Sequence, residues 1–100
     1  RGYWLPENRV KELIQKSEFR VSQKAACMLN CLAISQDSAL NLILAGDIDF
    51  EKSRIRGEAY PVYLVQAKTH SQDFSIQVAA FDSIAEIREW QALSAPCTCE

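Results

Sequence analysis

Four cysteines are the residues of this sequence whose type and spacing most directly suggest chemistry. Cys27 and Cys31 lie four positions apart in AACMLNCLA, and Cys97 and Cys99 lie two positions apart in the final PCTCE. On a helix the first pair shares a face, and on an extended tail the second pair points the same way. The spacing therefore predicts one meeting place for the four sulfur atoms.

Three kinds of site fit such cysteines. Two disulfides between helix and tail would each contribute roughly 4 kcal/mol of stability and would require an oxidising compartment, although the sequence does not choose the connectivity. A tetrahedral zinc site is the second, with spacings that differ from Cys-x-x-Cys knuckles. Buried free thiols are the third. Disulfides are preferred, so we expect no cofactor, with zinc as the minority alternative.

A polar surface site is a further candidate. Its residues would be Lys24, Lys52, Arg54, Arg56 and His70. Lys52, Arg54 and Arg56 alternate along a strand-like segment and could contact phosphates. A net charge of −2 without a basic run nevertheless weighs against binding of nucleic acid. His70 lies with Ser71 and Asp73 in one turn, whereas triad members come from separate elements. We therefore predict no catalytic residue.

Three acidic residues also alternate. Asp47, Asp49 and Glu51 would share one strand face and could bind a hard cation. A solvated edge strand, which charges protect from aggregation, is the preferred interpretation.

The bulk composition indicates one soluble-type domain over residues 1–100, with 48% hydrophobic and 24% charged residues. Residues 1–19 form a helical segment, and residues 20–100 form the remaining core. No apolar run reaches the roughly 20 residues that span a bilayer. Because the chain begins at Arg1, we expect a piece of a longer protein, and a signal peptide or membrane anchor upstream of it is compatible with the sequence.

The elements that must position the cysteines are helical first and extended later. Apolar spacing predicts a helix over 5–17, a second from Ser22 through Leu32 that is buried on most sides, and a third capped by Ser35 and stopped by a left-handed Gly46. Strands follow over 47–53, 60–68 and 73–81, and the last two form a hairpin around THSQ.

Residues 84–90 are ambiguous. Ser83 and Glu86 fit a capping box, and Ile84, Ile87 and Trp90 fit a helical stripe; a strand that follows a tight turn is the alternative. In either case we predict an α+β domain in which N-terminal helices pack on one face of a small antiparallel sheet of three to four strands.

Residues 20–100 resemble a bacterial family, domain of unknown function 4258. The resemblance is carried by SQKAACMLNCLAIS, ILAGDIDFEKS, YPVYLV, a hairpin and the terminal Cys-x-Cys, and it favours a strand over 84–90. The positions that match are Cys27, Cys31, Ile34, Gly46, Lys52, Ser53, Trp90, Cys97 and Cys99. The family has been likened to RelE-type toxin ribonucleases, with His and Arg as active groups. Here Lys24, Met28 and Leu32 stand at those positions.

These observations favour a non-catalytic binding or structural module, cross-linked by its cysteines and exported or periplasmic if they are disulfides. The sequence does not identify the partner: another protein is the first candidate and nucleic acid the weaker one. The alternative, implied by the resemblance, is a RelE-like RNA-binding or ribonuclease domain, for which Lys68 would join the polar residues above on one face.

Overall fold

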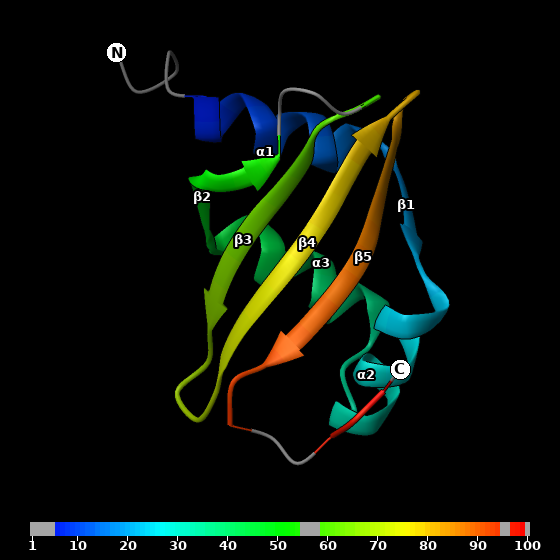
Figure 1. Cartoon of the computed structure of the whole chain (residues 1–100), viewed down its shortest axis with the longest axis vertical. Helices are drawn as coiled ribbons and strands as arrows, with labels where there is room; N and C mark the ends of the chain where they lie inside the picture. Colours follow the sequence, from blue (N-terminus) through cyan, green and yellow to red (C-terminus); the bar gives the residue numbers. More distant parts are fainter. Residues whose placement is uncertain (1–5, 55–58, 95–96, 100) are drawn as a thin grey trace.

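The computed structural model describes residues 6–54, 59–94 and 97–99, without the side chains of Pro6 and Arg54. In this part of the chain the element order is α1 (Pro6–Lys16), β1 (Glu18–Val21), α2 (Gln23–Leu32), α3 (Gln36–Ala45), β2 (Asp47–Arg54), β3 (Val62–Lys68), β4 (Asp73–Phe81) and β5 (Ile84–Ala92). The strands form one sheet; in Figure 1, α1 and α3 lie behind it and α2 lies beside the lower end of β5. The predicted α+β class is confirmed.

The sheet has five strands in the order β1-β5-β4-β3-β2, so the prediction of three to four strands was too small. The prediction of a purely antiparallel sheet was also wrong, because β1 pairs in parallel with β5. The amide of Glu18 donates to the carbonyl oxygen of Ser83 at 2.8 Å, and that of Ser22 to Ile87 at 2.9 Å. A strand of four residues such as β1 gives no sign in the sequence of which strand it pairs with. Its partner β5 lies more than sixty positions later in the chain, since Ser22 and Arg88 are 66 positions apart.

The starts of α2 and α3 follow the predicted capping. The hydroxyl of Ser22 accepts a hydrogen bond from the amide of Ala25, and that of Ser35 accepts one from Ser38. The predicted left-handed stop at Gly46 is wrong, since its φ and ψ are −82° and −175°. The left-handed residue is Ala33, at the end of α2, with φ of 59°.

Position 46 requires glycine for a reason other than a left-handed backbone. A Cβ atom there would lie 2.7 Å from the carbonyl oxygen of Gln66 and 3.0 Å from Val65 Cγ1. The chain therefore leaves α3 against the backbone of β3 at a separation that no side chain allows.

Residues 84–92 form the strand β5, so the helical alternative and its capping box are wrong. The turn before it places Asp82 and Ser83 at φ of 48° and 61°, both positive, as a two-residue hairpin turn requires. The register shifts in β5, where Val78 faces Ile87 but Gln77 faces Glu89, so Arg88 is an extra residue. This bulge keeps Ile87 and Trp90 on one face at a spacing of three, which imitates a helical stripe.

The hydrophobic core lies between the helices and one face of the sheet. Val10 and Ile14 of α1 are buried in it, each worth roughly 1.5–3 kcal/mol. The sheet contributes Ile48, Tyr63, Val65, Ala67, Phe74, Ile76, Val78, Ala80, Ala85, Ile87 and Trp90. None of the three described helices covers the opposite face, which is turned toward the viewer in Figure 1.

No single helix among the described residues has the length and apolar character needed to cross a membrane, and α2 and α3 meet the test only as a pair bent by 96°.

Candidate functional site

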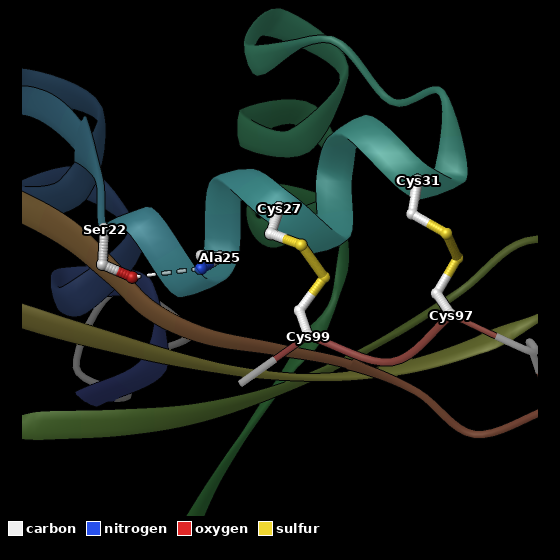
Figure 2. The surroundings of a disulfide bond; sticks show 6 residues. All are labelled: Ser22, Ala25, Cys27, Cys31, Cys97 and Cys99. Carbon is white, nitrogen blue, oxygen red and sulfur yellow. Dashed lines mark hydrogen bonds between the residues drawn. A yellow bond between two sulfur atoms is a disulfide. The ribbon is translucent and has the colours of Figure 1, made fainter.

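The four cysteines form two disulfides that fasten the C-terminal segment to α2. Cys27 is bonded to Cys99 and Cys31 to Cys97, with Cα–Cα separations of 6.1 Å in both pairs. Figure 2 shows the two bonds side by side, leaving one face of α2 toward the extended tail. The preferred interpretation, two helix-to-tail disulfides, is therefore the one that the structure contains.

This pairing follows from the local geometry. One turn of helix separates the sulfur atoms of Cys27 and Cys31, and two residues of extended chain separate those of Cys97 and Cys99 by a similar length. The tail runs opposite to α2, so the first helical cysteine meets the last cysteine of the chain. The Ser22 cap holds the start of α2 in Figure 2, and its hydroxyl also donates to the carbonyl oxygen of Arg88 at 2.9 Å.

The disulfides lie at the surface, whereas the other side of α2 is buried. Ala25, Met28 and Leu29 face the core, but Cys27 and Cys31 are exposed. The prediction that α2 is buried on most sides was therefore wrong. The apolar cysteines suggested a second buried face because a half-cystine and a core cysteine look alike in a sequence.

The tail covers the sheet beside α2. Cys97 and Cys99 are half-buried and pack against the core, and together with Met28 and Trp90 they line a hollow of 430 Å³. Trp90 is 1% exposed, and its indole N–H has no hydrogen-bond partner within the described residues. The disulfides therefore fix a covering segment over an aromatic part of the core.

Lys24 lies at the rim of this hollow and is paired. Its ammonium group donates to Glu89 Oε2 at 3.1 Å. The other oxygen of that carboxylate accepts from Gln77 at 3.1 Å. The bridge connects the start of α2 with the open face of the sheet.

A groove of 460 Å³ crosses the open face of the sheet. Lys52 and Lys68 both line it, and the acidic residue of its lining is Asp73, the first residue of β4, which faces Lys68 across the strand pair. The rest of the lining consists of Leu64, Gln66, Ala67, Phe74, Ser75, Gln77, Gln91 and Leu93. Of the predicted polar surface site, Lys52 therefore lies in this groove together with Lys68, whereas Lys24 lies at the hollow beside α2.

Arg54 and Arg56 cannot be added to this arrangement. The side chain of Arg54 and the whole of Arg56 lie outside the described residues. A different arginine is prominent on the same face: Arg88, at the bulge, bonds the hydroxyl of Tyr60 and lies 5.1 Å from the centre of its ring. The bond to Tyr60 and the ion pair with Glu86 raise the pKa of Arg88.

His70 lies in a separate cleft of 670 Å³ between α3 and the turn that joins β3 to β4. The turn is ordered around Thr69, whose hydroxyl accepts from the amides of Ser71 at 3.3 Å and Gln72 at 3.0 Å. No described acidic or basic side chain other than His70 lines the cleft. The four-residue loop THSQ that was predicted for this hairpin is confirmed, since β3 ends at Lys68 and β4 begins at Asp73.

The regular alternation of the acidic stretch extends over Asp47 and Asp49 and ends before Glu51. The register of β2 shifts after Asp49, whose carboxylate accepts from the amides of Glu51 and Lys52 at 3.1 and 3.2 Å. In the described part of the chain, no three His, Cys, Asp or Glu side chains gather where they could hold a metal ion.

Sequence reasoning missed the cleft beside His70 entirely. Its walls come from α3 and from a hairpin turn about thirty residues later, and each carries ordinary surface residues, such as Asn41 on α3 and Ser71 in the turn. No periodicity or motif joins these segments, so the cleft could be found only after the fold was known.

No protein-family model, curated protein or solved structure matches the chain.

Proposed function

We propose that this chain is a non-catalytic binding module that works in an oxidising compartment, such as the periplasm. The observation that carries the proposal is the pair of surface disulfides that closes the tail over α2. Exposed disulfides are reduced in the cytosol but persist in oxidising compartments. Small domains in those compartments use disulfides to supplement the stability of a limited hydrophobic core.

The surface that remains open supports binding. The sheet face, which no described helix covers, is hollowed by the groove at Lys52 and Lys68, and the cleft at His70 lies beside α3. Both hollows fall in the roughly 300–1,000 Å³ range of ligand sites. The module would therefore present preformed concave surfaces on a covalently braced frame.

The alternative, a RelE-like ribonuclease, requires its basic and acid–base groups on one surface. Of its candidates, Lys24 is paired with Glu89, Lys52 and Lys68 share the groove with Asp73, and His70 lies in the separate cleft. These positions divide the candidates among three hollows, which favours the binding proposal.

The compartment can be tested with thiol labelling in a bacterial host. The chain is expressed once with an export signal and once without, and cells are treated with a thiol-alkylating reagent before lysis. The exported chain should carry no alkyl group unless it is first reduced, and the cytosolic chain should carry four. Four free thiols in an exported, folded chain would refute the proposed compartment.

The absence of catalysis is tested separately. The purified oxidised chain is incubated with a structured RNA and with an unstructured RNA, beside variants Lys24→Ala and His70→Ala. We expect the same RNA half-life with the wild-type chain, either variant or buffer alone. Cleavage by the wild-type chain that is lost in either variant would establish the ribonuclease alternative.

A further inference from the structure

The cleft beside His70 has a lining unlike the rest of the surface. Although 24% of the residues in the sequence are charged, no described Asp, Glu, Lys or Arg side chain lines this cleft. Its apolar members are Leu32, Ala33, Ile34, Leu42, Ala45 and Phe74, and its polar members are Ser38, Asn41, Thr69, His70, Ser71 and Gln72.

The two kinds of residue differ in exposure. Phe74 is 3% exposed, and Ile34 and Leu42 are half-buried. Asn41 and His70 are exposed. The four less exposed apolar residues, Leu32, Ile34, Leu42 and Phe74, therefore form the floor of the cleft, and the exposed hydrogen-bonding groups stand around its mouth together with Ala33 and Ala45.

The walls are held in place before any ligand arrives. The amide of Ile34 donates to the carbonyl oxygen of Leu29 at 2.9 Å, which fixes the connection between α2 and α3. On the other side, the amide of Thr69 donates to the carbonyl oxygen of Gln72 at 2.8 Å and closes the hairpin turn. A ligand would lose little affinity to the ordering of these segments.

The chemistry of the lining selects the ligand. A charged group carried into this cleft would lose hydration without gaining an oppositely charged partner. An apolar ring would cover the floor, and one hydroxyl could bond with the amide, hydroxyl or imidazole groups at the mouth. Resting on the binding role proposed above, we propose that this cleft binds small uncharged molecules with an apolar ring and one hydroxyl group, of the phenol and benzyl alcohol class.

The single histidine makes the proposal directly measurable, because the sequence contains one His and its ring lines the cleft. The oxidised chain is titrated at fixed pH with 4-methylbenzyl alcohol, and the ring resonances of His70 and the backbone amides are followed by NMR. We expect saturable shifts at His70, Ser71 and Leu42, with a dissociation constant of about 1–10 mM for a ligand of this size.

A matched pair of ligands tests the charge requirement. The 4-methylbenzoate anion has the same ring and methyl group with a carboxylate in place of the alcohol. We expect it to bind at least about fivefold more weakly, because its charge is left unpaired in the cleft. Equal or tighter binding of the anion would overturn the assignment of an uncharged ligand.

A matched pair of variants tests the location. Ala45→Phe places a ring in the cleft, whereas Ala26→Phe makes the same change at an exposed position of α2 outside it. The first variant should lose the alcohol-dependent shifts and the second should keep them. If Ala45→Phe does not give a native amide spectrum, Ser38→Phe blocks the cleft from the first turn of α3.

Two negative results have different meanings. Shifts confined to the amides of Gln66 and Gln77 would place the ligand in the groove on the sheet, which overturns this site but leaves the binding role intact. No saturable shift at any residue would overturn the inference, while the proposed compartment and the absence of catalysis are judged by their own labelling and RNA experiments.

Discussion

The two disulfides should not stabilise the fold additively, because their loops are nested. Cys27 and Cys99 are 72 positions apart, for which the chain-entropy relation gives ~4.4 kcal/mol at 25 °C. Once that bond exists, the ring closed by Cys31 and Cys97 contains only residues 27–31 and 97–99. For these roughly eight residues the same relation gives ~2.5 kcal/mol.

Removing either disulfide alone should therefore lower the free energy of unfolding by only ~2.5 kcal/mol, the value for the smaller loop. The pair variant Cys27→Ala with Cys99→Ala should lose ~2.5 kcal/mol, and so should Cys31→Ala with Cys97→Ala. The variant with all four changes should lose ~7 kcal/mol, about 2 kcal/mol more than the sum of the two pair variants.

The assay is urea unfolding of the oxidised proteins, followed by tryptophan fluorescence and circular dichroism. Losses of ~4 kcal/mol in each pair variant, or a sum equal to the loss in the four-alanine variant, would refute the nested-loop reasoning. If the four-alanine chain does not fold, the size of the two single-bridge losses still decides between ~2.5 and ~4 kcal/mol.

Three further changes test the packing and the backbone. Gly46→Ala should destabilise the fold by roughly 1–3 kcal/mol in urea unfolding, because its Cβ would lie 2.7 Å from Gln66 O; no loss would contradict the close approach. Ala33→Gly should raise stability by about 1 kcal/mol, because φ there is 59°, whereas the control Ala26→Gly should lower it by about that amount. Burial raises the pKa of Tyr63 above 10.0, so its stabilising contribution is present below the pKa of an unfolded tyrosine and is lost as the pH rises through the folded-state pKa. Urea unfolding between about pH 9 and 11 should show a steeper loss in the wild type than in Tyr63→Phe, and parallel curves would contradict the burial effect.

The sequence was most informative where the structure depends on neighbouring residues. Ser22 and Ser35 mark the starts of α2 and α3 because a cap is a contact across three positions. The hairpin around THSQ was found for the same reason, since a turn is also local.

The sequence-based predictions were wrong where the conformation of a residue depends on a contact with a residue distant in the chain. Gly46 is required by the backbone of β3, not by its own helix. The spacing of Ile87 and Trp90 is helical only because a bulge at Arg88 inserts one residue between them. The parallel pairing of β1 with β5 and the cleft at His70 join segments far apart in the chain, and no local pattern reports such contacts.

The cysteines stand between these two cases. Their spacing placed each pair on one face, which is a local property, but it left disulfide, zinc and free thiol open. The connection of Cys27 to Cys99 and of Cys31 to Cys97 required the direction of the tail along α2, which only the folded chain supplies.

The most direct test of the central claim is the intact mass of the oxidised chain, native and denatured, before and after reduction, with a peptide map of the unreduced protein. We expect the denatured mass to rise by four hydrogen atoms on reduction, and the map to contain peptides that join Cys27 to Cys99 and Cys31 to Cys97. An unchanged mass on reduction, or a native mass that carries one zinc ion lost on denaturation, would contradict the disulfide-braced module.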